Sequence, residues 1–307
     1  MPRIALASAI AATGLDDDQA PLLTACAQAG LDARVLAWDD PTVSWCRYDA
    51  VLLRSTWDYC GRLPQFLAWC ELIDRVTTLL NPLPVLRWNT DKHYLTDLAA
   101  AGVPIVPSVF VETHQEPLPA LQAFLAMHAG SDAFVVKPAV GAGSRDTQRY
   151  SRNQEFAAAN HIGRLLDVGR SILLQPYLPS VDRDGETALM YFDGDFSHAI
   201  RKGPLLRVED GTTDALFAPE AITARVPGDD ERALAEHVLS AMMKTLDLAS
   251  PLAYARIDLI RDSAGAPRLL ELELCEPSLF FAHGTDSASR FVGALKTQAA
   301  LGAAVKL

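Results

Sequence analysis

The stretch YARIDLIRDSAGAPRLLELELCEP, residues 254–277, decides how the rest of the sequence is interpreted. Two runs of alternating polar and apolar residues flank a short segment with Asp, Gly and Pro, which predicts two strands joined by a turn. Period-two alternation places Arg256 and Asp258 on one face of the first strand. The same alternation places Glu271 and Glu273 on one face of the second strand.

An antiparallel register with Ile260 opposite Leu269 gives two facing pairs, Asp258 with Glu271 and Arg256 with Glu273. Facing carboxylates destabilise a sheet unless a cation lies between them. Mg²⁺ prefers oxygen ligands and binds through one or two carboxylates together with substrate phosphates. The pattern therefore favours a metal–phosphate platform. A solvated hairpin face also alternates charged and apolar residues, and it is the competing interpretation.

The composition indicates a globular protein of two or three modules, since the chain has 307 residues and half of them are apolar. A net charge of −11 without a basic block argues against a nucleic-acid groove. Five cysteines without a CxxC pair are typical of reduced thiols in a cytoplasmic protein. We expect the opening apolar run to be a buried strand, and no stretch approaches the roughly 20 apolar residues that span a bilayer.

The first eighty residues alternate between strand and helix patterns. Strands are expected at 3–9, 33–37, 50–53 and 76–80, with helices at 17–29 and 63–75. This order predicts an open parallel α/β sheet, whose ligands bind beyond the carboxyl ends of the strands. The segment RSTWDY, residues 54–59, directly follows a strand, so Arg54 and Asp58 are candidates for binding a charged substrate. A loop with a surface arginine is the alternative.

Two lysines in the middle of the chain lie near features that suit an anion. Residues 89–102 predict one helix capped by Asn89 or Thr90, which places Lys92 in its first turn, where backbone N–H groups can bind an anion. A strand at 133–136 brings Lys137 to a glycine-rich turn at 141–144. Glycines allow backbone amides to approach a phosphate closely. An ordinary tight turn is the alternative.

The last third predicts an antiparallel sheet with helices. Strands at 186–192 and 196–202 flank Asp193-Gly194, a strong hairpin signal, and the second strand ends at Lys202. Residues 203–226 have little periodicity and are expected to form a loop. Helices are expected at 229–246 and 287–299.

The succession of these motifs over residues 90–277 resembles the ATP-grasp superfamily of carboxylate–amine ligases. The matching pieces are Lys92, VVKP with its glycine-rich turn, QPYL, a hairpin ending in lysine, and ARID followed by LELE. The resemblance implies a parallel N-terminal sheet, a small lid module and a C-terminal antiparallel sheet. We expect these to occupy residues 1–86, 87–176 and 177–307.

The resemblance also implies roles for individual residues, with ATP and Mg²⁺ as cofactors. Lys92 and Lys137 would bind the phosphates of ATP. Gly141, Gly143 and Ser144 would belong to a flexible loop that covers these phosphates. The adenine slot is formed by Gln175, Tyr177 and Leu178, with Asp182 or Glu186 near the ribose. Lys202 and Arg256 face the γ-phosphate, and Asp258, Glu271 and Glu273 hold Mg²⁺. Many relatives have Asn where Glu273 stands, which adds charge here without removing an oxygen ligand.

The implied activity is transfer of the γ-phosphoryl to a small amino-acid-like carboxylate, followed by attack of an amine-type nitrogen on the acyl phosphate. RSTWDY and LELELCEPSLFF are similar to the cyclo-ligases of cycloserine biosynthesis, which close O-ureido-D-serine into a ring. Arg54, Asp58 and Ser278 are then substrate candidates. A glutathione-synthetase-like or peptide-forming ligase is an alternative, as is a non-catalytic nucleotide-binding module. A homodimer is a further expectation, without nucleic-acid or membrane partners.

Overall fold

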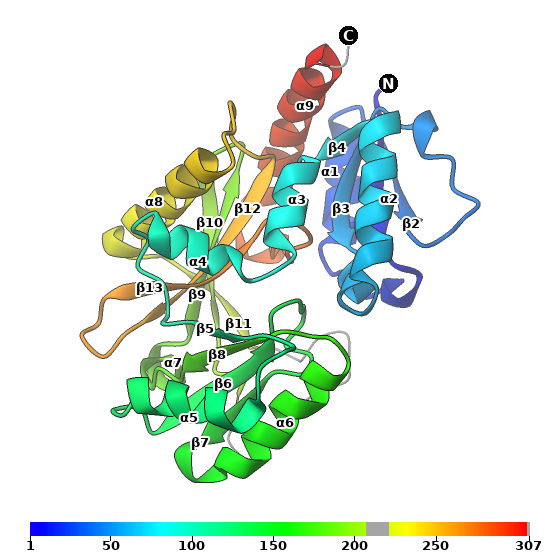
Figure 1. Ribbon diagram of the computed structural model, residues 1–307. Helices are drawn as coiled ribbons and strands as arrows, with labels where there is room; N and C mark the ends of the chain where they lie inside the picture. The colour runs from blue at the N-terminus through cyan, green and yellow to red at the C-terminus, as the bar shows by residue number, and fades with distance from the viewer. Residues whose placement is uncertain (207–220, 306–307) are drawn as a thin grey trace.

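Three sheets form the protein, which is described by a computed structural model over residues 1–206 and 221–305 (Figure 1). The first sheet is parallel, in the order β2-β1-β3-β4. Its strands are β1 Arg3–Ser8, β2 Asp32–Ala37, β3 Ala50–Ser55 and β4 Thr78–Leu80, and its helices are α1 Gln19–Gln28 and α2 Leu63–Val76. Alternate residues of β1 face opposite helices, because Ile4 packs with α1 whereas Ala5 packs with α2.

The C-terminal sheet is antiparallel, in the order β11-β10-β9-β12-β13. Its strands are β9 Glu186–Phe192, β10 Asp195–Lys202, β11 Ile222–Arg225, β12 Tyr254–Arg261 and β13 Pro267–Glu273. Helix α8, Asp229–Thr245, covers one face together with α4, Tyr94–Ala100. Helix α9, Ser287–Val305, covers the other face.

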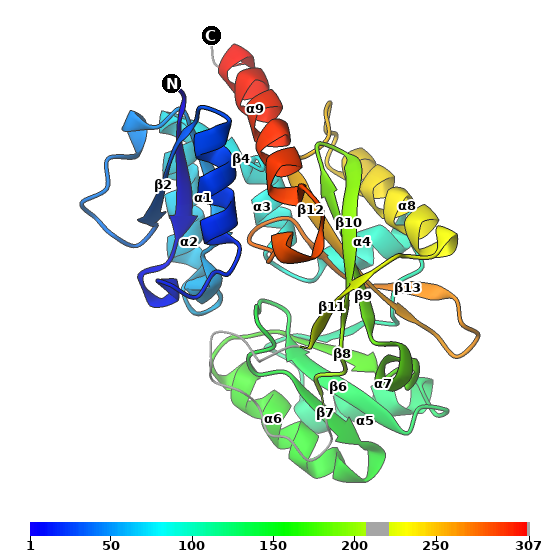
Figure 2. The ribbon, with the colours of Figure 1, turned by 180° about the vertical axis from the view of Figure 1, so that it is seen from behind.

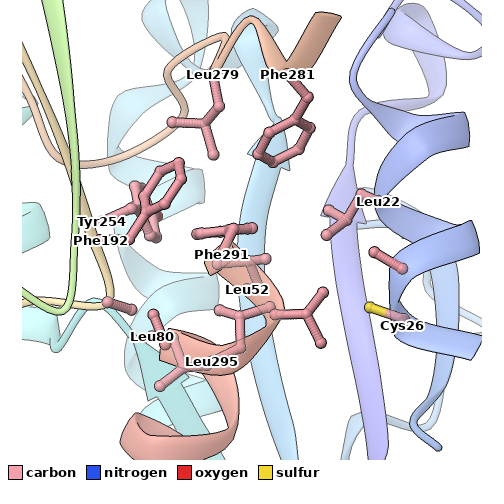
Figure 3. Close-up of a cluster of buried hydrophobic side chains, with 14 of the residues drawn as sticks. Leu22, Cys26, Leu52, Leu80, Phe192, Tyr254, Leu279, Phe281, Phe291 and Leu295 are labelled. Carbon is pink, nitrogen blue, oxygen red and sulfur yellow. The ribbon is translucent and has the colours of Figure 1, made fainter. Parts of the chain in front are cut away.

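A single buried cluster joins the N-terminal and C-terminal sheets (Figure 3). Phe291 and Leu295 of α9 lie between Leu22 of α1 on one side and Phe192 and Tyr254 of the C-terminal sheet on the other. Each of these five side chains is at most 4% exposed. Because burial of such apolar surface is the main stabilising term, α9 fixes the two parts relative to each other.

The small module lies below the other two parts in Figures 1 and 2 and has its own core. Its antiparallel sheet has the order β5-β8-β6-β7. The strands are β5 Val109–Val111, β6 Ala133–Pro138, β7 Gln148–Ser151 and β8 Ile172–Pro176, covered by α5 Pro117–Met127 and α6 Glu155–Asp167. A short helix, α7 Ser180–Asp184, then leads to β9.

The fold class predicted from sequence is confirmed, but some elements differ. The single helix expected from residue 89 or 90 is wrong, since α3 covers Leu83–Asn89 and α4 begins only at Tyr94. Pro82 and Pro84 lie at the start of α3, because proline suits the first helical turn. The loop expected at 203–226 contains β11, and its residues 207–220 lie outside the described part of the chain. The 3₁₀ segments are η1 Ile10–Ala12, η2 Trp45–Arg47, η3 Trp57–Gly61, η4 Arg152–Gln154 and η5 Phe281–His283.

Candidate active site

A cavity of about 520 Å³ lies where the three sheets meet. Its lining comes from the loop before α1, from η3, from the small module and from β12–β13 with the segment that follows. Most of the residues assigned from sequence line it: Lys92, Lys137, Gly141, Gly143, Ser144, Gln175, Tyr177, Leu178, Glu186, Lys202, Arg256, Asp258, Glu271, Glu273 and Ser278. Arg54, Asp58 and Asp182 do not belong to the lining.

The β12–β13 hairpin pairs Asp258 with Glu271 and Arg256 with Glu273, as predicted. The register behind that prediction is wrong, since Ile260 lies opposite Arg268 and Leu269 lies opposite Leu259. A bulge accounts for the difference. Leu270 is the extra residue on β13, and it shifts the register by one before the carboxylates are reached.

Cations pair with the carboxylates of this face. Lys202 Nζ lies 2.7 Å from Asp258 and 2.6 Å from Glu186. Arg256 donates to Asp258 at 2.9 Å and also pairs with Glu273. All five side chains lie on β9, β10, β12 or β13, so the sheet itself sets their spacing.

Burial and charge act in opposite directions on these carboxyl groups. Arg256 and Lys202 outweigh the burial of Asp258 and hold its pKa well below its usual range. Burial dominates at the other two, raising the pKa of Glu186 to about 8 and that of Glu273 to about 7. The raised values follow first from burial, and the neighbouring carboxylate of Asp258 adds to them at both groups.

This donor set fits a divalent cation that binds oxygen ligands. Asp258, Glu271 and Glu273 offer carboxylate oxygens on adjacent strands, and a cation would relieve the repulsion between them. Over residues 1–206 and 221–305, no three His, Cys, Asp or Glu side chains are already gathered as a metal centre. The ion pairs with Lys92, Lys202 and Arg256 occupy these oxygens instead.

Two lysines enter the cavity from outside the C-terminal sheet. Lys92 lies in the turn between α3 and α4, where its ammonium pairs with Glu271 at 2.8 Å and donates to the Gly141 carbonyl at 2.8 Å. Lys137 on β6 is 8% exposed, and no ion pair to it is found in the described part of the chain. Burial lowers the pKa of Lys137 because it disfavours the ammonium form. An anionic ligand would supply the missing counter-charge.

The glycine-rich turn between β6 and β7 forms the edge of the cavity beside these lysines. Gly143 and Ser144 have φ of 62° and 59°, the left-handed region that glycine adopts most readily. A Cβ at Gly141 would lie 3.0 Å from the Pro138 ring. Arg170 holds the far end of the turn through Asp146, at 2.5 Å.

The part of the lining formed by β8 and the residues after it lies beside Lys137, because β8 pairs with β6. Gln175 of β8 is buried and donates to the Ser108 hydroxyl at 2.9 Å. The Tyr177 hydroxyl donates to Asp182 at 2.5 Å, and the Arg149 guanidinium lies 3.5 Å from the centre of its ring. Asp182 therefore fixes Tyr177 from behind the wall, whereas Glu186 lines the cavity itself.

Two buried asparagines hold the backbone that follows the carboxylates. The Asn89 amide donates to the Leu272 carbonyl at 2.8 Å and accepts from the Leu274 N–H at 2.7 Å. Asn81 donates to the Leu274 carbonyl at 2.9 Å. Asn89 is thus the last residue of α3 and a clamp on β13, not the helix cap expected from sequence.

The segment after β13 is anchored by the N-terminal part. The Asp18 carboxylate accepts the backbone N–H groups of Leu279, Phe280 and Phe281 at 2.6, 3.0 and 2.8 Å. Arg54 is 2% exposed and donates to the Pro277 carbonyl at 3.0 Å while pairing with Asp18 at 3.3 Å. Arg54 and Asp18 therefore position the segment that carries Ser278.

Asp58 also lies outside the cavity lining. Its carboxylate accepts from the Trp38 indole at 2.9 Å and pairs with Arg62. Ser278 does line the cavity, and its carbonyl accepts from Arg256 at 3.2 Å. Of the three substrate candidates, only Ser278 reaches the cavity wall.

Comparison with known proteins agrees with this geometry. Residues 4–81 match the family model described as the N-terminal domain of D-cycloserine synthetase DcsG. The cycloserine biosynthesis protein DcsG of Streptomyces lavendulae is 44% identical over 292 residues, covering 95% of this chain and 97% of that protein. The chain belongs to the DcsG family of ATP-grasp ligases.

Solved structures support the same family. The crystal structure of D-cycloserine synthetase DcsG matches with a TM-score of 0.92 at 44% identity, over 97% of this chain and 99% of that one. The ATP-grasp ligase PsnB, in complex with a phosphomimetic variant of its minimal precursor, Mg and ADP, matches with a TM-score of 0.63 at 18% identity. That match covers 97% of this chain and 99% of that one, and it supports the ATP-grasp fold.

Sequence interpretation missed several residues of this DcsG-family cavity. Asp16, Tyr59 and Glu276 line it, and none was assigned a role. Tyr59 ends the RSTWDY segment, and Glu276 follows Glu273 by three residues, so both were within the motifs already singled out. Their position could not be derived from alternation, because neither lies on a strand.

Proposed function

We propose that the protein is an ATP- and Mg²⁺-dependent cyclo-ligase that closes O-ureido-D-serine to D-cycloserine. The observation that carries the proposal is 44% identity to DcsG across nearly the whole chain. A cavity lined by both lysines and carboxylates supports it. A glutathione-synthetase-like or peptide-forming ligase would use the same phosphate site. Product mass separates these alternatives, since ring closure loses atoms whereas ligation adds a partner.

The nucleotide would bind between the small module and the C-terminal sheet. Lys92 and Lys137 bind the phosphates, and Lys137 supports this role because it is buried without an ion pair among the described residues. Gly141, Gly143 and Ser144 cover them with backbone amides. The base lies against Gln175, Tyr177 and Leu178, with Glu186 toward the ribose and Asp182 holding Tyr177 in place.

Mg²⁺ would be held by Asp258, Glu271 and Glu273 and would neutralise phosphate charge. Lys202 and Arg256 lie beside the same carboxylates and present cationic groups to the transferred phosphoryl group. Phosphoryl transfer depends on positioning and charge neutralisation more than on a protein nucleophile. The substrate carboxylate attacks the γ-phosphorus, and the resulting acyl phosphate is an electrophile that a nitrogen can attack.

The acid would occupy the side of the cavity near Ser278 and η3. Arg54 would act there through the Pro277 backbone that it holds, and Asp58 through its contacts with the Trp38 and Arg62 side chains. We place the reaction in the cytoplasm, consistent with five free cysteines. No helix in residues 1–206 and 221–305 has the length and apolar character needed to cross a bilayer. A homodimer stays a prediction.

The direct test measures ADP release with ATP, Mg²⁺ and a panel of acids that includes O-ureido-D-serine, D-serine and dipeptide precursors. We expect stimulation by O-ureido-D-serine and formation of D-cycloserine by mass. Stimulation only by acids that gain a partner would favour the ligation alternative. Tight ATP binding without Mg²⁺ dependence or turnover would favour a non-catalytic nucleotide-binding module.

A further inference from the structure

A buried glutamate in the lining of the cavity has no role in the reaction so far. Glu276 lies in the turn after β13 and is 8% exposed. Its Oε2 is buried without a hydrogen-bond partner. An unsatisfied buried polar atom costs about 1–3 kcal/mol, so its retention requires an explanation.

The position of Glu276 is fixed by η3 of the N-terminal part. The Trp57 indole donates to the Glu276 backbone carbonyl at 3.1 Å. The Tyr59 hydroxyl acts on the Glu276 carboxyl group by lowering its pKa, against the larger effect of burial. Tyr59 is 4% exposed, so its side chain is held in place. The carboxyl group is therefore held at the wall with capacity for another donor.

Glu276 differs from the other carboxylates of the cavity in its surroundings. Glu186, Asp258, Glu271 and Glu273 each pair with a lysine or arginine, whereas no ion pair to Glu276 is found in the described part of the chain. Burial and the charge of Glu273 raise the pKa of Glu276 to about 8. Such a pKa lies within the range in which general bases work, and the carboxylate form that can accept a proton becomes the main one above about pH 8.

We propose that Glu276 is the catalytic base that accepts the proton of the attacking ureido nitrogen during ring closure. The inference rests on the proposed function and assigns a further residue to it. As the N–H bond breaks, its proton passes to the Glu276 carboxylate and the nitrogen electron pair forms the C–N bond. The C–O bond to the phosphoryl group then breaks, and its electron pair leaves with inorganic phosphate. The ring nitrogen still carries its carbamoyl group, and water must cleave that C–N bond, releasing carbamate, to give D-cycloserine.

Glu276 could instead bind the α-ammonium group of the substrate acid. This role and the role as a base for the ureido nitrogen have different consequences for the reaction. An ammonium-binding residue contributes equally before and after the carboxylate is activated, so its loss weakens both steps. A base for the nitrogen contributes only to ring closure. Carboxylate activation alone can be measured by trapping the acyl phosphate with hydroxylamine, which is neutral at pH 7 and needs no protein base.

The test compares cyclisation with hydroxamate formation in wild type and Glu276→Gln, using ATP, Mg²⁺ and O-ureido-D-serine. We expect Glu276→Gln to lower kcat for cyclisation about a hundredfold or more while hydroxamate formation stays within about threefold. Tyr59→Phe should lower cyclisation less. The double variant should be no slower than Glu276→Gln alone, because both act through one carboxyl group.

Glu231→Gln is the control for loss of a buried carboxylate, since Glu231 is 2% exposed and lies outside the cavity lining. It should leave the ratio of cyclisation to hydroxamate formation unchanged. A Glu276→Gln variant that cyclises at the wild-type rate would overturn the inference, as would equal loss of both activities. Absence of cyclic product from wild type would overturn the proposed function, and the inference with it.

Discussion

The two halves of the cavity neutralise their carboxylates in different ways. On the side that we propose for the phosphates, Lys92, Lys202 and Arg256 pair directly with the acidic side chains of the sheet. On the side near Ser278, Asp18 accepts backbone N–H groups in addition to its ion pair with Arg54, and no ion pair to Glu276 is found among the described residues. Side-chain cations suit a ligand whose charge changes during the reaction. Backbone donors suit a wall that must keep its shape.

The largest effect that we expect comes from Glu271→Gln on the phosphate side. The amide keeps a hydrogen-bond acceptor for Lys92 but removes a negatively charged ligand for Mg²⁺. We expect kcat to fall more than about a hundredfold, with a melting temperature close to that of wild type. Steady-state ADP release and thermal unfolding check this.

Glu71→Gln is the matched control, because Glu71 pairs with Arg87 on the surface at 2.6 Å. Glu71→Gln should change neither kcat nor the melting temperature measurably. A fully active Glu271→Gln variant would remove Glu271 from the metal site and weaken the contrast between the two halves.

The next effect is on stability and comes from Asp18→Asn on the acid side. The amide presents one oxygen where the carboxylate presents two, and its NH₂ group would face backbone N–H donors. Arg54 would also lose its partner in a buried pair. We expect the free energy of unfolding to fall by about 3 kcal/mol in urea denaturation.

Asp32→Asn serves as the comparison, since its pair with Arg34 is solvent-exposed at 65% and 35%. We expect a change below about 0.5 kcal/mol there. Similar values for Asp18→Asn and Asp32→Asn would contradict the view that Asp18 anchors the segment after β13.

Lys137→Met should have effects of opposite sign on binding and stability. Removing a buried ammonium without an ion pair relieves its desolvation, so we expect the free energy of unfolding to rise by about 1 kcal/mol. The KM for ATP should rise about tenfold or more, because a phosphate contact is lost. Lys244→Met, at an exposed position of α8, is the control. Unchanged nucleotide affinity would exclude Lys137 from the phosphate site.

The last prediction concerns the pH dependence of the stability of Glu276→Gln. The pKa of Glu276 is raised from 4.5 to about 8, so the folded protein retains a proton that the unfolded chain has released. This contribution to stability is complete below pH 4.5 and is lost as pH rises through about 8. Relative to wild type, Glu276→Gln should gain up to about 1.4 kcal/mol per pH unit across that window. If the difference in unfolding free energy between Glu276→Gln and wild type did not change with pH, the raised pKa of Glu276 would be contradicted.

The same contrast explains how far the sequence was informative. The residues proposed for the phosphates lie near one another in sequence motifs, such as Lys137 with its glycine-rich turn, and they line the cavity together. Their role in phosphate binding stays a prediction. The acid side depends on long-range contacts, such as Asp18 with Leu279, which are 261 residues apart. No local pattern reports such a contact.

The sequence patterns also failed to predict two local features, a strand register and a helix boundary. Because of the bulge at Leu270, Ile260 lies opposite Arg268, one residue away from the partner that alternation alone predicted. The helix expected at 89–102 begins only at Tyr94, and Asn89 ends the preceding helix α3, where its side chain holds the backbone of Leu272 and Leu274. In both cases tertiary contacts override a local preference.

The most direct test of the account is a crystal structure with ADP, Mg²⁺ and an analogue of O-ureido-D-serine. We predict metal density between Asp258, Glu271 and Glu273, phosphates at Lys92 and Lys137, and the ureido group of the analogue against Glu276. Nucleotide phosphates on the acid side, or metal away from these three carboxylates, would contradict the division of the cavity into two halves.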